Sequence, residues 1–133
     1  MPPTRDVMNN GVKGRILCVE DNEDECELIR WILKGHDVTC VATIDEAHKL
    51  LENNRFDLAI IDEHLPDGSG MSLCRQLTAE KATTPCIIVS GDTFITLNEA
   101  KDAGAQALLI KSMVNYLEEL QWSVDRYDRS ATA

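Results

Sequence analysis

Residues 16–27 read ILCVEDNEDECE, where an apolar run passes directly into a cluster of acidic side chains. The segment 15–19 (RILCV) predicts a strand that is buried on both faces of a sheet. Six of the eight residues at 20–27 are Asp or Glu, and like charges this close together repel one another. The cluster therefore needs a positive partner, which a helix N-terminus or a bound cation can provide.

Short apolar segments and helical patterns alternate along the rest of the chain. Further strands are predicted at 37–41 (DVTCV), 57–61 (DLAII), 86–90 (CIIVS) and 107–110 (ALLI). Helices are predicted at 23–34, behind a capping box at 43–46, and at 71–79, 95–103 and 114–124. Five strands alternating with five helices indicate an α/β fold, in which helices cover both faces of a doubly wound parallel sheet.

The length and the charge of the chain limit what it can be. Its 133 residues suit one domain, placed at 14–126 between a flexible lead-in at 1–13 and a tail at 127–133. The chain has 13 Lys and Arg against 23 Asp and Glu, a net charge of −10. This balance argues against direct binding to nucleic acid or to an anionic membrane. No apolar stretch approaches the ~20 residues that a membrane span needs.

Five cysteines are spread over the chain without a CxxC motif. They are Cys18, Cys26, Cys40, Cys74 and Cys86, and four of them sit among apolar neighbours. This pattern is typical of small buried hydrophobic side chains in a reducing compartment. We therefore expect the protein to be cytoplasmic.

The strand ends are the first place to look for chemistry, because ligands of open α/β sheets bind beyond the carboxyl ends of the strands. The first strand ends in Glu20 and Asp21, and the third ends in Asp62. Ser90 ends the fourth strand, and Lys111 follows the fifth. Three carboxylates, a hydroxyl and an ammonium group are therefore predicted at one edge of the sheet.

The acidic cluster divides into two halves at Asn22, which is placed to cap a helix. The acids at 23–25 fall in the first turn of that helix, where the helix dipole favours negative charge. Glu20 and Asp21 lie before the cap and would crowd together with Asp62. A hard divalent cation relieves this repulsion, and Mg²⁺ prefers a few carboxylates completed by waters and a phosphate oxygen.

The residues at the strand ends carry a family resemblance. The segments ILCVEDNE, FDLAIIDEHLPDGSG, PCIIVSGD and AGAQALLIK, with the EA of IDEAHKLL, resemble a response-regulator receiver domain of bacterial two-component signalling. The match extends over about residues 14–126. It implies a flavodoxin-like (βα)5 fold with strand order 2-1-3-4-5. It also implies a signalling phosphoacceptor, and not an enzyme with a separate substrate.

The resemblance assigns a role to each residue at this edge. Asp62 is implied as the phosphoacceptor. Glu20 and Asp21 are implied as Mg²⁺ ligands together with Asp62 and the backbone carbonyl of His64. These roles suit phosphoryl transfer, which asks mainly for an in-line nucleophile and for charge neutralisation.

The phosphoryl-binding groups and the partners follow from the same resemblance. The hydroxyl of Ser90 is implied to bond the phosphoryl group, and Lys111 to pair with it. The implied phosphodonor is a sensor histidine kinase or a phosphotransfer protein. The implied receiver of the signal is a downstream output protein or an attached domain, and a phosphorylation-dependent homodimer is a further hypothesis.

Two positions depart from the usual receiver pattern. The family usually has an aromatic residue three positions before the lysine, and here that residue is Leu108. It usually has a proline directly after the lysine, often with a cis peptide, and here Ser112 predicts a trans bond. These departures motivate an alternative function, a phosphorylation-independent pseudo-receiver that acts as a protein-interaction module.

Each site residue also has a purely structural explanation. Asp62 and Ser90 both precede turn sequences, Lys111 can be a solvated residue before a helix, and Glu20 with Asp21 can be further helix-start acids. His64 raises the alternative of a side-chain ligand for a transition metal. An aspartate-nucleophile phosphatase is disfavoured because its second acid would fall at His64, and a dinucleotide binder because acids replace its Gly-rich loop. Trp122 is a candidate for a partner surface.

Overall fold

The computed structural model describes residues 14–80 and 84–132, so the lead-in predicted at 1–13 lies outside the described residues. The central sheet contains β1 (Arg15–Val19), β2 (Asp37–Val41), β3 (Leu58–Asp62), β6 (Cys86–Ser90) and β7 (Ala107–Ile110). Every pairing in this sheet is parallel, and the order is β2-β1-β3-β6-β7. With β6 and β7 as the fourth and fifth strands, the predicted order 2-1-3-4-5 is confirmed.

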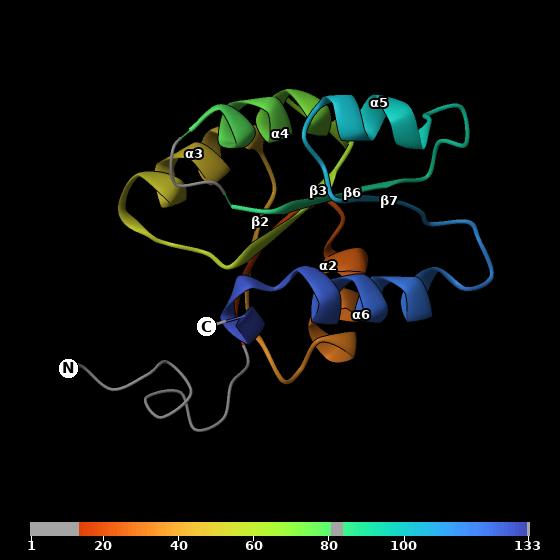
Figure 1. The fold of residues 1–133 in the computed structure, drawn as a ribbon, viewed down its shortest axis with the longest axis horizontal. Helices are drawn as coiled ribbons and strands as arrows, with labels where there is room; N and C mark the ends of the chain where they lie inside the picture. Colours follow the sequence, from red (N-terminus) through yellow and green to blue (C-terminus); the bar gives the residue numbers. More distant parts are fainter. Residues whose placement is uncertain (1–13, 81–83, 133) are drawn as a thin grey trace.

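Helices cover both faces of the sheet (Figure 1). They are α2 (Glu23–Ile32), α3 (Ile44–Asn53), α4 (Gly70–Ala79), α5 (Leu97–Asp102) and α6 (Tyr116–Tyr127), followed by the 3-10 helix η1 (Arg129–Thr132). Helices α3, α4 and α5 lie on one face, and α2 and α6 lie on the other (Figure 1). Among the described residues, no helix is long and apolar enough to cross a membrane.

The core has two layers because successive side chains of a strand point to opposite faces. In β3, Ala59 and Ile61 pack in the layer with α3, α4 and α5, whereas Leu58 and Ile60 pack in the layer with α2 and α6. All five residues of β3 are buried, which explains its nearly continuous apolar sequence. The sheet is therefore a rigid platform from which the strand ends project.

Two helices are shorter at their start than predicted. Helix α5 begins at Leu97 and not at 95, because Thr96 and Glu99 form a complete capping box there. Helix α6 begins at Tyr116 and not at 114, because a turn after β7 takes up the intervening residues. Val114 was predicted on the apolar face of α6, but its exposed fraction is 106%, so it lies outside the core.

The capping box predicted at Thr43–Glu46 is only half formed. The Thr43 hydroxyl oxygen accepts a hydrogen bond from the backbone N–H of Glu46, but the Glu46 carboxylate binds the Thr43 hydroxyl and not its backbone. The carboxylate of Asp67 instead accepts from Ile44 N and Asp45 N at 2.9 and 3.0 Å. These two backbone hydrogen bonds lower the pKa of Asp67.

Asp67 lies at the tip of a small hairpin, where the sequence predicted only a turn. The hairpin pairs β4 (His64–Leu65) with β5 (Gly68–Ser69) in antiparallel register. A side chain at Gly70, which follows the hairpin, would collide with the backbone carbonyl of Asp62. The hairpin thus ties the segment after β3 to the start of α3 and holds it close against Asp62.

The residues after α6 close the opposite end of the sheet. Asp128 is buried, and its carboxylate accepts a hydrogen bond from Ser130 N at 2.9 Å. His36 Nε2 lies 3.4 Å from Asp128 Oδ2, and both side chains are almost inaccessible to solvent. Helix α6 itself continues to Tyr127, one residue beyond the boundary predicted at 126.

We expect Asp128→Asn to reduce the free energy of unfolding by about 1–3 kcal/mol at neutral pH, as for a buried hydrogen-bonded charge. Burial acts to raise the pKa of Asp128, but His36 and Ser130 outweigh it and lower this pKa. A lowered pKa in the folded state stabilises the fold above the unfolded pKa of about 3.9 and loses this effect at lower pH. In urea unfolding, the wild type should therefore have a larger free energy of unfolding than Asp128→Asn at neutral pH. This difference should shrink as the pH falls through the folded-state pKa of Asp128. Asp125→Asn, on the exposed side of α6, is the control and should cost little; equal losses in both variants would contradict the prediction.

Candidate functional site

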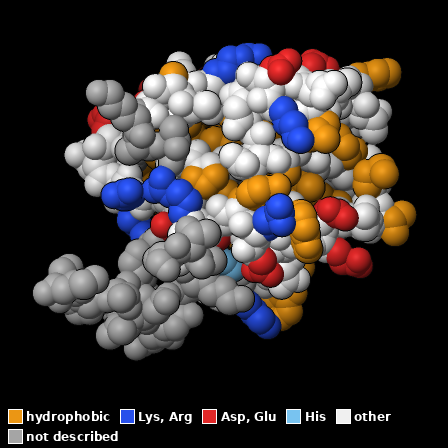
Figure 2. Space-filling view, viewed as in Figure 1, with side chains coloured by type: hydrophobic (Ala, Val, Ile, Leu, Met, Phe, Trp, Pro, Cys, Tyr) orange, Lys and Arg blue, Asp and Glu red, His pale blue; other side chains and the backbone are white. Residues whose placement is uncertain are grey.

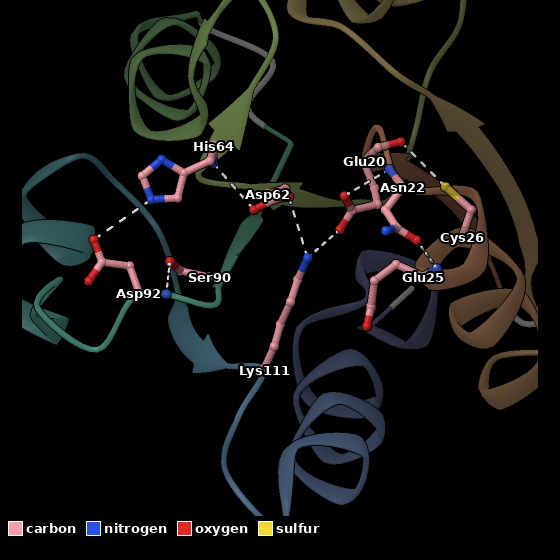
Figure 3. A network of polar contacts seen from close by, with 9 residues as sticks. All are labelled: Glu20, Asn22, Glu25, Cys26, Asp62, His64, Ser90, Asp92 and Lys111. Carbon is pink, nitrogen blue, oxygen red and sulfur yellow. Dashed lines mark hydrogen bonds and ion pairs between the residues drawn. The ribbon is translucent and has the colours of Figure 1, made fainter.

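The carboxyl ends of β1, β3, β6 and β7 deliver the predicted site residues to one edge of the sheet (Figure 3). Glu20 follows β1, Asp62 ends β3, Ser90 ends β6 and Lys111 follows β7. Glu20 and Asp62 have exposed fractions of only 3% and 7%, whereas Asp21 is exposed. Two carboxylates are thus held in a largely dry setting while a third faces solvent.

Lys111 joins the two buried carboxylates (Figure 3). Its Nζ lies 2.5 Å from Glu20 Oε1 and 3.4 Å from Asp62 Oδ2. Its backbone N–H donates to the Ser90 carbonyl at 2.8 Å, which anchors the start of the Lys111 segment to the end of β6. One ammonium group therefore serves two acidic partners and leaves an excess of negative charge.

The pKa values in this cluster reflect that excess. Burial raises the pKa of Glu20 and Asp62 adds to the rise, while the hydrogen bond from Lys111 opposes it. Burial acts to lower the pKa of Lys111, but the two carboxylates outweigh it and the pKa is raised. The lysine therefore keeps its charge at neutral pH, and the carboxylates compete for a single positive partner.

The residues present fit a hard divalent cation. Oxygen atoms of Glu20, Asp21 and Asp62 lie within 4.8 Å of one another, so one ion could contact all three carboxylates. An all-oxygen donor set suits Mg²⁺, and the exposed position of Asp21 leaves room for the waters that Mg²⁺ retains. The donor chemistry of this cluster is that of a magnesium site.

His64 contributes its backbone to the cluster and its ring to another contact. Its backbone N–H donates to Asp62 Oδ1 at 3.3 Å. Its exposed imidazole extends toward Asp92, with Nε2 3.7 Å from Oδ2, and away from the carboxylates (Figure 3). The group of possible metal ligands at this edge of the described structure does not include the His64 ring. The role of the His64 carbonyl stays a prediction.

Ser90 is fully buried beside Asp62 and is part of a tight turn. Its Oγ accepts a hydrogen bond from Asp92 N at 2.9 Å, and Asp92 Oδ1 accepts from Phe94 N at 2.8 Å. The loop after β6 is therefore organised around the Ser90 hydroxyl. A partner that draws the Ser90 oxygen away from Asp92 N would therefore change the conformation of this loop.

Two supporting residues were missed by sequence reasoning. Glu63 accepts hydrogen bonds from Ser69 Oγ at 2.9 Å and from Met71 N at 2.8 Å, and so braces the segment next to Asp62. Asp92 positions both the His64 ring and the loop after β6. The sequence offered one signal for these two residues, their closeness to the predicted strand ends. Glu63 directly follows Asp62, and Asp92 lies two residues after Ser90.

The two atypical positions lie on either side of Lys111. Leu108 is half-buried and packs against the core layer beneath α5. Ser112 is exposed, and the described residues contain no cis peptide bond, so the predicted trans bond after Lys111 is confirmed.

Comparison with known proteins agrees with this geometry. The sequence profile of the family described as Response regulator receiver domain matches residues 16–122. The sensory/regulatory protein RpfC of Xanthomonas campestris pv. campestris is 29% identical over 107 residues, which cover 75% of this chain and 15% of RpfC. The regulatory protein VanR of Enterococcus faecium is 31% identical over 103 residues, which cover 75% of this chain and 44% of VanR. The chain thus spans less than half the length of these curated relatives.

A solved structure extends the comparison to three dimensions. The receiver domain of the sensor histidine kinase PA1611 from Pseudomonas aeruginosa PAO1, solved with a magnesium ion coordinated in its active site cleft, is 29% identical. The superposition covers 86% of this chain and 96% of that one, with a TM-score of 0.74. Sequence profile, fold and strand-end residues agree, and the chain belongs to the response regulator receiver domain family.

Proposed function

We propose that this chain is a phosphoacceptor in two-component signalling, in which Asp62 takes a phosphoryl group from a phosphohistidine of a sensor histidine kinase or a phosphotransfer protein. The observation that carries the proposal is the contact of Lys111 Nζ with both Glu20 and Asp62 at the mouth of the acidic cluster. A buried carboxylate next to a fixed ammonium is placed to act as a nucleophile on an anionic group.

Each residue has a distinct part in this reaction. A carboxylate oxygen of Asp62 forms the new bond to phosphorus as the bond to the donor histidine breaks, giving an acyl phosphate. Glu20, Asp21 and Asp62, with the backbone carbonyl of His64, would hold Mg²⁺, which supplies charge neutralisation for the phosphoryl oxygens. Lys111 is within reach of the same oxygens, since it already contacts Asp62.

The response to phosphorylation passes through Ser90. A phosphoryl oxygen on Asp62 would accept a hydrogen bond from the Ser90 hydroxyl, whose oxygen at present accepts from Asp92 N. Drawing that hydroxyl toward Asp62 shifts the population of conformations of the loop after β6. Leu108 packs where the family usually has an aromatic residue, so backbone movement of this loop carries the change.

Exposed hydrophobic side chains flank this loop, and a partner that binds them would be sensitive to the conformation of the loop. Phe94, Leu97, Met113, Val114 and Trp122 have exposed fractions from 47% to 106%. They belong to the loop after β6, to α5, to the turn after β7 and to α6. Hydrophobic side chains gather on this side of the molecule, between the layer of α4 and α5 and helix α6 (Figure 2). This surface fits an output protein, an attached domain or a second copy of the chain, in the cytoplasm.

A second candidate function is a phosphorylation-independent interaction module. It is favoured by Leu108 and Ser112, which replace the aromatic residue and the proline usual in the family. In both functions the chain acts in signalling and not as an enzyme with a substrate of its own.

The acceptor is tested by intact-mass spectrometry after incubation with acetyl phosphate and Mg²⁺. We expect one phosphoryl adduct, absent with EDTA and absent in Asp62→Asn, because both the cation and the nucleophile are needed. Asp125→Asn, which changes an exposed carboxylate of α6, should retain the adduct. An adduct that persists in Asp62→Asn would refute the assignment, and no adduct in a folded, Mg²⁺-loaded protein would favour the interaction module.

The metal site is tested by thermal and urea unfolding with and without Mg²⁺. At about ten times the dissociation constant, Mg²⁺ should add about 1.4 kcal/mol to the free energy of unfolding. Asp21→Asn should greatly reduce this gain, since Asp21 is exposed and its replacement does not disturb the core. The matched control is Asp24→Asn, another exposed acid that lies outside the cluster and should keep the full gain. Equal gains in the two variants would count against the site.

The conformational response is tested by hydrogen exchange. Phosphorylation of the wild type should alter amide exchange at 90–96, because the Ser90 hydroxyl leaves its contact with Asp92 N. Ser90→Ala should still gain the adduct but show little of this change, whereas Ser112→Ala, in an exposed turn, should respond like the wild type. An identical exchange pattern before and after full phosphorylation of the wild type would exclude the switch.

A further inference from the structure

Three cysteine side chains converge in one layer of the core. Their Sγ atoms, from Cys18, Cys26 and Cys40, all lie within 4.8 Å of one another. Cys18 and Cys40 are register partners on the adjacent strands β1 and β2, and Cys26 belongs to α2, which covers that face of the sheet. The cluster is therefore built by three consecutive elements whose packing already determines the fold.

The cluster has only sulfur donors and an apolar surrounding. Cys18 and Cys26 are buried and Cys40 is half-buried, and all three are free thiols. Ile16, Ile29 and Leu33 are among the side chains of the same core layer. Cys40 provides the exposed side through which a small ion can reach the other two sulfurs.

The number of sulfur atoms separates this group from the other two cysteines. Cys74 and Cys86 pack in the opposite layer of the core and form a pair. The thiol of Cys18, with that of Cys26 and the nearby Arg30 charge, outweighs the effect of burial and lowers the pKa of Cys40 to about 6, and the neighbouring thiol of Cys86 likewise lowers the pKa of Cys74. The distinction of the cluster is therefore geometric: three sulfur atoms within 4.8 Å of one another can surround one ion, whereas Cys74 and Cys86 offer two.

The geometry points to a three-thiolate site for a soft monovalent cation, Cu(I), formed by Cys18, Cys26 and Cys40. Thiolates are the ligands that select soft cations, and structural zinc sites usually require a fourth ligand. A metal–sulfur distance of about 2.3 Å in a trigonal arrangement places the sulfurs about 4 Å apart. The present separations, all within 4.8 Å, are close to this value. Binding releases the thiol protons to solvent and involves no change in oxidation state.

The site is separate from the magnesium cluster and does not depend on the proposed phosphoacceptor function. The two are neighbours, because Cys26 Sγ donates to the backbone carbonyl of Glu20 at 3.4 Å (Figure 3). The carboxylate of Glu20, however, interacts with Lys111 and with Asn22 N, so sulfur and oxygen donors belong to different groups.

The test is an anaerobic titration of the full chain with Cu(I) buffered by a chromogenic Cu(I) chelator. We expect one equivalent to bind, with a sulfur-only coordination shell in X-ray absorption. Cys40→Ser removes one ligand and should weaken binding by more than the roughly 10–100-fold that losing an outer-shell partner costs. Cys74→Ser is the matched control, and Asp62→Asn tests independence from the acidic cluster; both should bind as the wild type does.

A second measurement covers the case in which Cys40→Ser does not fold. In the wild type, bound Cu(I) should protect Cys40 from alkylation by iodoacetamide, which otherwise reaches this half-buried thiol. The proposal is overturned by unchanged affinity in a folded Cys40→Ser, by unprotected alkylation at full occupancy, by nitrogen or oxygen ligands in the X-ray spectrum, or by displacement of Cu(I) by an equal concentration of Zn²⁺.

Discussion

The contact of one ammonium group with two buried carboxylates is the constraint on which the functional edge of this receiver domain depends. Lys111 Nζ touches both Glu20 and Asp62, and the exposed Asp21 adds a third carboxylate beside them. Burial strengthens every charge interaction here, since little water is present to screen it. With Lys111 in place, the cluster still has more negative than positive charge. A bound divalent cation, or a chemical change of the Asp62 carboxylate, would alter this balance.

The parallel sheet makes that contact possible because it places four carboxyl ends side by side. Register pairs Asp62 with Val89 across β3 and β6, and Ser90 with Ile110 across β6 and β7. Around this rigid platform, the segment after Asp62 is braced by Glu63 and by the hairpin that Asp67 ties to α3. The loop after Ser90 is held by the hydrogen bonds from Asp92 N to the Ser90 hydroxyl and from Phe94 N to Asp92 Oδ1. The segment next to Asp62 is thus tied to another element of the fold, whereas the hydrogen bonds at the start of the loop after β6 lie within the loop itself.

The two helical layers give the same platform different chemical surroundings. One layer, under α3, α4 and α5, contains Leu108 and the pair Cys74 and Cys86 among its hydrophobic side chains. The other, under α2 and α6, contains the thiol of Cys18 from β1, and Cys40 from β2 packs against it. Because Cys18 lies two residues before Glu20, the three cysteines lie next to the carboxylates at the sheet edge, and Cys26 Sγ donates to the Glu20 backbone carbonyl.

The sequence by itself determined the class of fold and the residues at the strand ends, because both depend on local patterns of apolar residues and on where each strand stops. It failed at Val114 and at the start of α5, where turn and cap hydrogen bonds override apolar spacing. Only the tertiary structure decided that Lys111 meets Glu20 across 91 residues of sequence. It also decided that His64 turns to Asp92 and that three separated cysteines converge. Such contacts arise from strand register and helix packing, which join residues distant in the chain and leave no periodic signal within it.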